Sequence, residues 1–304
     1  MKVLTHHQSV LLMICAATMW SSAGVLTRHL HSAHGVEVTF WRSVFAALFV
    51  AIALCWTERG RAVQTVRALG AVGLVSGLMW AAMFSCFMIA LTMTTVANTL
   101  IVMSVSPLLT ALLARLFLRE KIAARTWLAI AVALLGMVWM FARGVSHVGP
   151  VESLGMVIAL GVPMAASINV ILLKKAGARV DLIPAVLVGG ALSAAIMLPF
   201  IFPLRVERHD LAIMVALGVF QLGLPCMLMV LAARALAAPE IALLALIEVI
   251  LGPVWAWLWA AETPASETLS GGALVIAALV FNELLALRVA SAQAARTAAA
   301  RTLP

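Results

Sequence analysis

Charged residues are scarce in this chain. Of its 304 residues, 11% are charged and 64% are hydrophobic, and the mean hydropathy is +1.13. This composition excludes a water-soluble globular domain and indicates an integral membrane protein. There are only two aspartates, Asp181 and Asp210, and both lie between apolar segments. An enzyme that uses a pair of intramembrane aspartates is therefore excluded.

The short motifs of common enzyme classes are missing as well. The chain has no H-E-x-x-H, G-x-S-x-G or P-loop pattern and no glycine-rich nucleotide fingerprint. Its cysteines lie inside apolar segments, at spacings that suit neither a metal site nor a disulfide framework: Cys15, Cys55, Cys86 and Cys226. We expect a protein that is not an enzyme and that needs no cofactor.

Ten apolar windows account for most of the chain. A helix of about 20 residues crosses a hydrocarbon core of about 30 Å, and each window is close to that length. We expect an all-α integral membrane protein with ten transmembrane helices and no room for a globular domain. The windows are 9–28, 36–56, 69–91, 96–118, 125–142, 153–173, 182–203, 211–233, 240–260 and 269–288.

The net charge of +8 reflects where the basic residues lie. If the N-terminus is cytoplasmic, 14 of the 20 lysines and arginines fall in cytoplasmic segments and 4 fall on the other side, while Arg42 and Arg115 lie inside windows. This excess is the positive-inside pattern, and it places both termini in the cytoplasm. The basic balance thus indicates membrane topology rather than a nucleic-acid partner.

The segment from Thr94 to Met140 sets the plan of the chain. An apolar run interrupted by Ser106-Pro107 ends in the charged turn Arg119-Glu120-Lys121, and a second apolar run follows. The pattern partly returns about 140 residues later, when Glu120 is laid on Glu262. Each half then holds five windows, and because five is odd, the second half enters the membrane from the opposite side. We expect two inverted five-helix repeats, 9–142 and 153–288, and a disordered cytoplasmic tail, 289–304.

These features resemble the EamA family of the drug/metabolite transporter superfamily. Ser106-Pro107, a leucine-rich run, Arg119-Glu120 and a Gly-containing apolar helix stand in the order of that family, and the resemblance covers nearly the whole chain. The length and the Trp- and Met-rich interior are most similar to bacterial exporters of aromatic and neutral amino acids. In one place the chain departs from the pattern, because Glu248-Val249 stands where family members resemble Glu-Pro. Since Pro253 follows, we expect the kink to have moved there rather than vanished.

The resemblance and the proline-broken windows together imply a secondary transporter. Inverted repeats with interrupted helices are typical of proteins that bind substrate near the membrane midplane, between the repeats. The resemblance implies that the first, third, fourth, sixth, eighth and ninth windows line the cavity. We expect one repeat to rock against the other, with bending at Pro107, Pro163, Pro225 and Gly252-Pro253.

Glu248 is the best candidate for binding or coupling. It lies about eight residues into its window, where an ionised carboxylate is costly without a partner or water. It could carry a coupling proton or bind a substrate ammonium, and the alternative is a structural hydrogen bond to a broken helix. The other candidates suit neutral, zwitterionic or aromatic metabolites but are equally typical of packed membrane core. They are Trp20, Met79, Trp80, Phe84, Asn98, Met103, Pro163, Ser167 and Gln221.

Arg42 and a histidine-rich loop each allow two interpretations. Arg42 lies about six residues into its window, so we expect it to pack between helices, to snorkel or to pair with Glu37, with substrate contact as the alternative. His29, His31 and His34 precede that window at a spacing that metal sites also use. Without a cysteine or carboxylate cluster nearby in sequence, we expect a solvated periplasmic loop and no metal site.

The sequence therefore predicts a multi-pass transporter of the inner membrane that exports small metabolites, above all aromatic or neutral amino acids. Lysine is absent from all ten windows, which disfavours sugar phosphates, because a phosphate needs several cations. A nucleoside, purine or drug-like compound is the alternative substrate, and a non-transporting receptor or structural protein is the alternative function. The expected partners are a small-molecule substrate and the lipid bilayer, with a proton as coupling ion and a monomer as the working unit.

Overall fold

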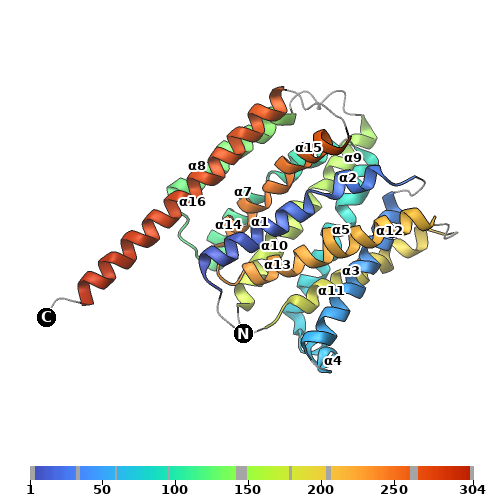
Figure 1. Ribbon diagram of the computed structural model, residues 1–304, viewed down its shortest axis with the longest axis horizontal. Coiled ribbons are helices and arrows are strands. Elements are labelled where there is room, and N and C mark those ends of the chain that lie inside the picture. The colour runs from blue at the N-terminus through green and yellow to red at the C-terminus, as the bar shows by residue number, and fades with distance from the viewer. Residues whose placement is uncertain are drawn as a thin grey trace.

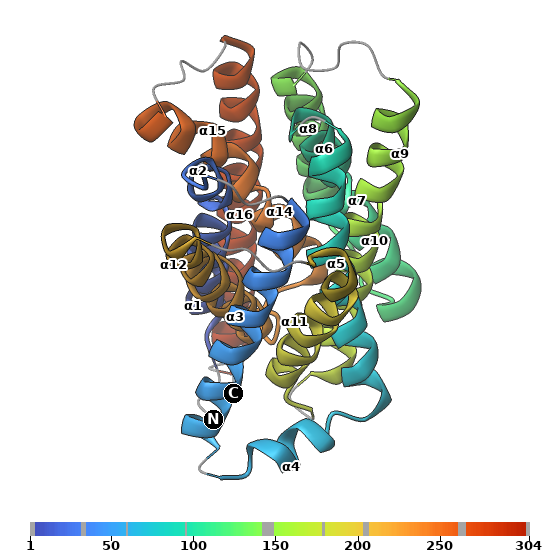
Figure 2. The same ribbon diagram turned by 90° about the vertical axis from the view of Figure 1, so that its right-hand side faces the viewer.

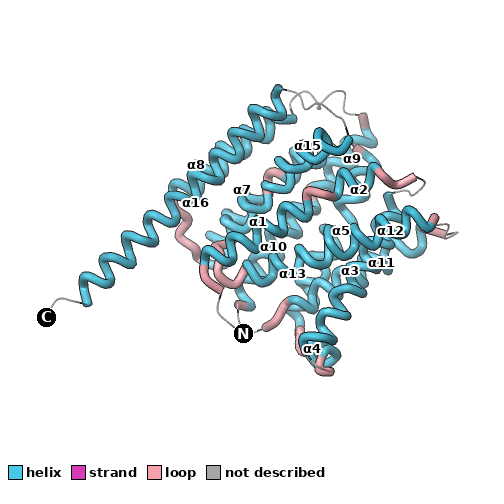
Figure 3. Tube along the Cα trace, viewed as in Figure 1, coloured by secondary structure: helices cyan, strands magenta, loops and turns pink. Residues whose placement is uncertain are grey.

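The computed structural model describes residues 4–31, 35–58, 60–94, 96–141, 149–177, 180–202, 207–260 and 266–301. Every regular element in these residues is helical, as Figure 3 shows. The prediction of an all-α protein is confirmed for this part of the chain.

The helices follow the predicted windows in order. The first half contains α1 (His6–Trp20), α2 (Ala23–Arg28), α3 (Gly35–Thr57), α4 (Ala62–Arg67), α5 (Gly70–Met93), α6 (Val96–Met103), α7 (Ser106–Leu113), the π-helix η1 (Ala114–Leu118) and α8 (Ala124–Phe141). The second half contains α9 (Pro150–Ala159), α10 (Gly161–Ala176), α11 (Ile183–Met197), the short 3₁₀-helix η3 (Leu198–Phe200), α12 (Arg208–Ala216), the π-helix η4 (Leu217–Gly223), α13 (Leu224–Ala232), α14 (Ala238–Ala245), α15 (Ile247–Ala260) and α16 (Ser266–Arg301).

Seven helical segments in the described residues are long and apolar enough to cross a membrane. They coincide with the first, second, third, sixth, seventh, eighth and ninth predicted windows. Three shorter apolar helices, Ser106–Leu118, Ala124–Trp139 and Leu269–Asn282, fall on the fourth, fifth and tenth windows. Many large apolar side chains face outward, such as Trp56 at 85% exposure. An outer surface of this kind is expected in hydrocarbon and not in water.

The two halves pack against each other through equivalent helices (Figures 1 and 2). α3 lies against α11, and α8 lies against α16, its counterpart in the other half. Contacts between non-equivalent helices also come in matched pairs, in which each helix is replaced by its counterpart from the other half. α5 packs on α11, and their counterparts η4 and α3 pack on each other. α10 packs on α5, and their counterparts α1 and α13 pack on each other as well. The pattern of contacts is therefore unchanged when the two halves are interchanged, as expected of two repeats related by a twofold axis.

The α8–α16 pair is antiparallel along its length. At one end Arg125 Nη1 donates to the carbonyl of Leu285 at 3.3 Å, and at the other end Trp139 Nε1 donates to Ser270 Oγ at 2.9 Å. α16 then continues to Arg301 and projects beyond the bundle in Figure 1. Residues 289–301, expected to belong to a disordered tail, are thus helical. The segment is rich in Ala and Arg, and both residues favour the helix.

Two helices break at equivalent points. α6 ends at Met103 and α7 begins at Ser106, beside Pro107, which has no N–H to bond the Met103 carbonyl. In the second half the interruption lies at Leu246, 142 residues after Ser104 and at the offset that relates Glu120 to Glu262. α15 runs through Gly252 and Pro253 without interruption. The interruption in the second half therefore keeps the position that it has in the first half, seven residues before Pro253.

Because of the break at Leu246, the first two N–H groups of α15 do not bond the carbonyls of the preceding helix. The Leu246 N–H donates to the Leu243 carbonyl at 3.0 Å, and the Val249 N–H donates to the Leu246 carbonyl at 3.0 Å. Among the described residues, no backbone hydrogen bond joins the N–H of Ile247 or Glu248 to α14. A carboxylate is favoured at such a helix start, because the free N–H groups and the helix dipole attract negative charge. Glu248 stands in this first turn.

Candidate functional site

The π-helix η4 brings the eighth helical segment against α3. Pro225 cannot donate to the carbonyl of Gln221, and the backbone just before it widens into a π-helix. Gly218 permits the close approach, because a Cβ there would collide with the Cβ of Phe45 and would lie 2.8 Å from the Arg42 carbonyl oxygen. The local sequence therefore places Gln221 beside Arg42.

Arg42 is the centre of a buried polar network. Its Nη1 donates to Gln221 Oε1 at 3.3 Å, and its Nη2 donates to the Phe84 carbonyl at 3.5 Å. Gln221 Nε2 in turn donates to the Trp20 carbonyl at 3.3 Å. The network thus joins α1, α3, α5 and η4 and includes three of the predicted cavity residues. Arg42 is 3% exposed.

Two expectations for Arg42 are wrong. Its side chain does not snorkel to the surface, because it points inward to Gln221 and Phe84. It does not pair with Glu37 either, since no carboxylate of the described residues lies within 4 Å of its guanidinium. A buried cation with only neutral acceptors is costly, and a nearby anion would offset that cost.

Glu248, at the start of α15, is an acidic residue of the same region. Cys226 is buried in the hydrophobic cluster against which Trp20 and Ile247 pack, and α15, which carries Glu248, packs on α1 and α2. Glu248 has no hydrogen bond or ion pair with another side chain in the part of the chain that the structure describes. We call Trp20, Arg42, Phe84, Gln221, Cys226 and Glu248 the central site. It holds one cationic and one acidic side chain that do not form an ion pair with each other.

The interruption between α1 and α2 forms one wall of the central site. Ser21 Oγ donates to the Thr18 carbonyl at 2.5 Å, and Ser22 Oγ donates to the Met19 carbonyl at 2.7 Å, so hydroxyl groups satisfy carbonyls at the break. Trp255 Nε1 of α15 donates to Ser21 Oγ at 2.6 Å. Side chains from η4 and α15 therefore both contact the backbone or the side chains at this interruption.

A second group of predicted residues lies at the α6–α7 interruption. Ser167 Oγ of α10 accepts a hydrogen bond from Thr110 Oγ1 at 2.9 Å and donates to the Ser106 carbonyl at 3.4 Å. Met103 is the last residue of α6, and Pro163 is buried in α10. The structure connects Ser167 to the interruption rather than to Arg42.

The remaining candidates have other surroundings. Trp80 is 2% exposed, packs on the ring of Phe84 with centroids 5.7 Å apart and lies against Gly189 of α11. This favours a packed core aromatic over a cavity wall. Asn98 Nδ2 donates to Thr94 Oγ1 at 3.0 Å, where α5 ends, and Met79 is half-buried on α5. No described contact joins Asn98 or Met79 to the central site.

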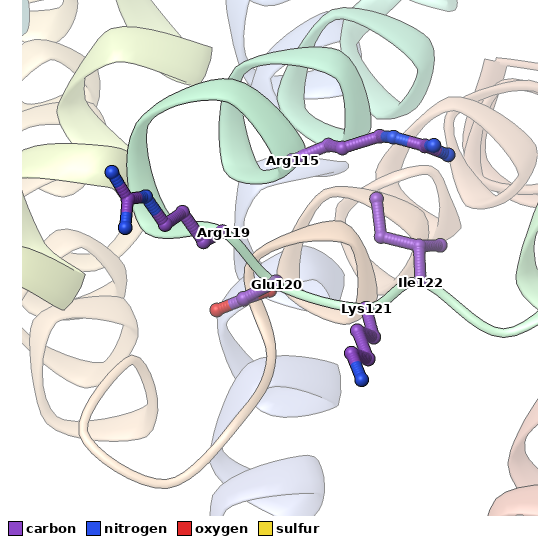
Figure 4. A pocket seen from close by; sticks show the side chains of 5 residues that line it. All are labelled: Arg115, Arg119, Glu120, Lys121 and Ile122. Carbon is purple, nitrogen blue, oxygen red and sulfur yellow. The ribbon is translucent and has the colours of Figure 1, made fainter.

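A cavity of about 330 Å³ lies at the charged turn that follows η1. Its lining consists of Arg115, Arg119, Glu120, Lys121 and Ile122. Figure 4 shows the basic side chains pointing in different directions, so they do not converge on a common ligand. This turn does not resemble a binding site for a small metabolite.

The sequence does not predict the positions of Cys226 and Trp255 beside Trp20 and Ser21. Trp20 packs against the cluster that contains Cys226, and Trp255 donates to Ser21 Oγ. In both cases more than 200 residues of sequence lie between the partners, so no local pattern predicts the contact. Arg42 had a detectable signal, because a charge within an apolar window is a functional candidate by default.

Comparison with known proteins agrees with this architecture. The model of the EamA-like transporter family matches the chain twice, over residues 7–142 and 153–283. A solved structure titled "Crystal structure of protein" superposes with a TM-score of 0.76 at 19% sequence identity, covering 93% of this chain and 99% of that chain. At this identity the similarity concerns the fold alone. None of the curated proteins matches the chain.

Proposed function

The chain belongs to the EamA-like transporter family, and from that premise we propose that it exports neutral and aromatic amino acids across the inner membrane by alternating access. Family membership establishes a membrane transporter rather than an enzyme. The amino-acid substrate, the direction of transport and the inner membrane are parts of the proposal.

The proposed topology has ten spans in two inverted repeats with both termini in the cytoplasm. The seven long apolar helices and the three shorter ones supply the ten segments. The matched contacts between the halves support the twofold relation, and the basic residues support the orientation. Five spans in each half make the repeats inverted, as in many secondary transporters. A monomer contains both repeats and therefore a complete pathway.

The observation that carries the substrate proposal is a buried cationic side chain in the same region of the bundle as an acidic side chain. Arg42 is buried with neutral acceptors only, and Glu248 stands at the start of α15. A guanidinium binds a carboxylate through charge-assisted hydrogen bonds, and a carboxylate binds an ammonium group in the same way. An α-amino acid carries both groups. The aromatic rings of Trp20 and Phe84 would favour an apolar or aromatic side chain.

The central site must open for substrate to enter. Arg42, Phe84 and Gln221 are each at most 5% exposed in this structure. In the proposed cycle, the substrate carboxylate takes over the Arg42 hydrogen bonds to Gln221 Oε1 and the Phe84 carbonyl. The interruptions at Ser21-Ser22, Ser104-Val105 and Leu246 are where the helices would bend as one repeat moves against the other.

The test is flux of radiolabelled substrate into proteoliposomes that contain the purified protein. Neutral and aromatic amino acids form one arm, and nucleosides, purines and phosphorylated sugars form the others. Each arm is run with and without an imposed pH gradient. We expect saturable flux of the amino acids alone, and faster flux under the gradient if Glu248 carries a coupling proton.

Other results would change the proposal in defined ways. Flux of nucleosides or purines without amino-acid flux would retain the transporter and replace its substrate. Equal flux in protein-free liposomes would show that the protein does not carry the measured flux. No flux in any arm, from protein that is folded by tryptophan fluorescence, would contradict the amino-acid proposal.

A further inference from the structure

A cluster of metal-ligating side chains lies outside the central site, where α2 ends and α12 begins. His31 follows α2, and His209 and Asp210 stand in the first turn of α12. Figure 2 shows α2 and α12 close together at this edge of the bundle. One nitrogen of each histidine and one oxygen of Asp210 all lie within 4.8 Å of one another. The two halves of the chain therefore contribute jointly to this cluster.

The distances suit ligands that share one ion. His209 Nδ1 lies 3.3 Å from Asp210 Oδ1, and His31 Nδ1 lies 4.0 Å from Glu207 Oε2. In a tetrahedral zinc site with bonds of about 2.0–2.1 Å, neighbouring ligand atoms are about 3.3 Å apart. The first pair already has this separation, and the second needs a shift of less than about 1 Å.

The hydrogen bonds around the cluster and the exposure of its side chains are also compatible with a metal site. The Asp210 side chain is 1% exposed, and its Oδ1 accepts the backbone N–H of His31 at 3.0 Å, which holds the α2–α3 loop beside α12. The side chains of His31 and His209 are 65% and 53% exposed. A fixed carboxylate and two accessible imidazoles give the cluster an anchored ligand and an open entry path, as a metal site requires.

We propose that His31, His209 and Asp210, together with Glu207, form a binding site for a divalent transition-metal ion. Two imidazoles and one or two carboxylates are a donor set typical of Zn²⁺ and of its neighbours in the first transition series. The imidazole rings now stack with centroids 4.3 Å apart and an angle of 12° between their planes. At least one ring must therefore rotate to direct its nitrogen to the ion. Exposed side chains make such rotations readily.

Binding at this site would tie the α2–α3 loop of the first half to α12 of the second half. The bound ion would add to the Asp210 contact a second link between the same two segments. A ligand that binds only the native state stabilises it, so unfolding should shift to higher temperature as the ion is added. The proposal does not depend on transport and survives any outcome of the flux experiment.

The test is calorimetric titration of Zn²⁺ into the full-length protein in detergent, purified through a handle that contains no histidine. We expect one equivalent to bind and the temperature of unfolding to rise. His31→Ala and His209→Ala should each weaken binding at least tenfold, and the double variant should abolish it. His29→Ala is the matched control, because this histidine lies in the same loop and its Nδ1 hydrogen-bonds the Val25 carbonyl at 2.8 Å. It should bind like the parent chain.

Asp210→Asn is a supporting variant, since Asp210 is buried and its loss could alter the local fold. The two exposed histidines keep the test decisive, and their variants should unfold at the parent temperature when no metal is present. Absence of saturable one-equivalent binding would overturn the proposal. Binding that persists unchanged in the double histidine variant would overturn it as well.

Discussion

Arg42 Nη1 lies 3.3 Å from Oε1 of Gln221, a residue 179 positions later in the chain. This contact crosses from the first family repeat to the second, and it gives a buried cation a neutral partner in place of an anion. Charged residues within membrane segments are costly and usually functional. The contact therefore joins the two family repeats at a buried charge.

Removing the guanidinium should abolish most transport. Arg42→Ala should lower the flux of neutral amino acids at least tenfold, because a hydrogen bond to a charged group contributes about 1.5–3 kcal/mol. Arg115→Ala removes an exposed cation of η1 and is the control. Proteoliposome flux checks the prediction, with the amount of folded protein measured in parallel. Equal flux in the two variants would exclude Arg42 from substrate binding.

Gln221→Glu should lower transport without lowering stability. The new carboxylate would stand beside the Arg42 guanidinium and compensate its charge, so the temperature of unfolding should stay the same or rise. The same carboxylate would compete with that of the substrate, so flux should fall at least tenfold. Unfolding scans and flux assays on one preparation test both parts. A variant that transports normally would show that substrate does not approach Arg42.

Glu248→Gln should remove the effect of a pH gradient if this residue carries the coupling proton. The amide keeps the size of the side chain but cannot be ionised or bind a proton in this pH range. We expect flux down a substrate gradient to continue and its acceleration by an imposed pH gradient to disappear. Parallel vesicles with and without the gradient provide the measurement. Unchanged acceleration in the variant would assign coupling to another group.

Pro107→Ala should slow transport more than it lowers the yield of folded protein. An alanine N–H can bond the Met103 carbonyl, which would favour a continuous helix across the interruption between α6 and α7. Flux per folded molecule should drop severalfold. Size-exclusion chromatography supplies the folded fraction. If yield and flux fall in proportion, Pro107 serves folding rather than bending.

Alanine substitutions at two helical glycines, Gly218 and Gly252, should change the stability of the protein in opposite directions. Gly218→Ala would force a Cβ against Phe45 and should destabilise the protein by about 1–3 kcal/mol, because the contact between α3 and η4 has no space for it. Gly252→Ala meets nothing within 4 Å and should be neutral or stabilising by about 0.5–1 kcal/mol. Thermal unfolding in detergent compares the two. A Gly252→Ala protein that is stable but transports substrate slowly would support the predicted bending role of Gly252.

Much of the fold could be predicted from the sequence, because apolar window lengths and proline positions are local signals. The helices, the repeat offset of 142 and the break near Pro107 follow from such patterns. The break at Leu246 has no proline beside it, so a rule based on proline does not find it.

The central site could be predicted only in part. Trp20, Gln221 and Glu248 stood out as polar or aromatic residues inside apolar windows. The direction of the Arg42 side chain could not be predicted, since it depends on the approach of η4 to α3 through Gly218. The cluster of His31, His209 and Asp210 was missed because its carboxylate lies 179 residues from the histidine-rich loop. Spacing rules detect only ligands that are neighbours in sequence.

The length of α16 has a practical consequence for imaging this small membrane protein. Its 36 residues span about 54 Å at 1.5 Å per residue, whereas the apolar part covers only Leu269–Asn282. A rigid helical partner joined in register after Arg301 would therefore stand clear of the detergent belt. Such a fusion would give electron cryomicroscopy an asymmetric landmark without touching either repeat.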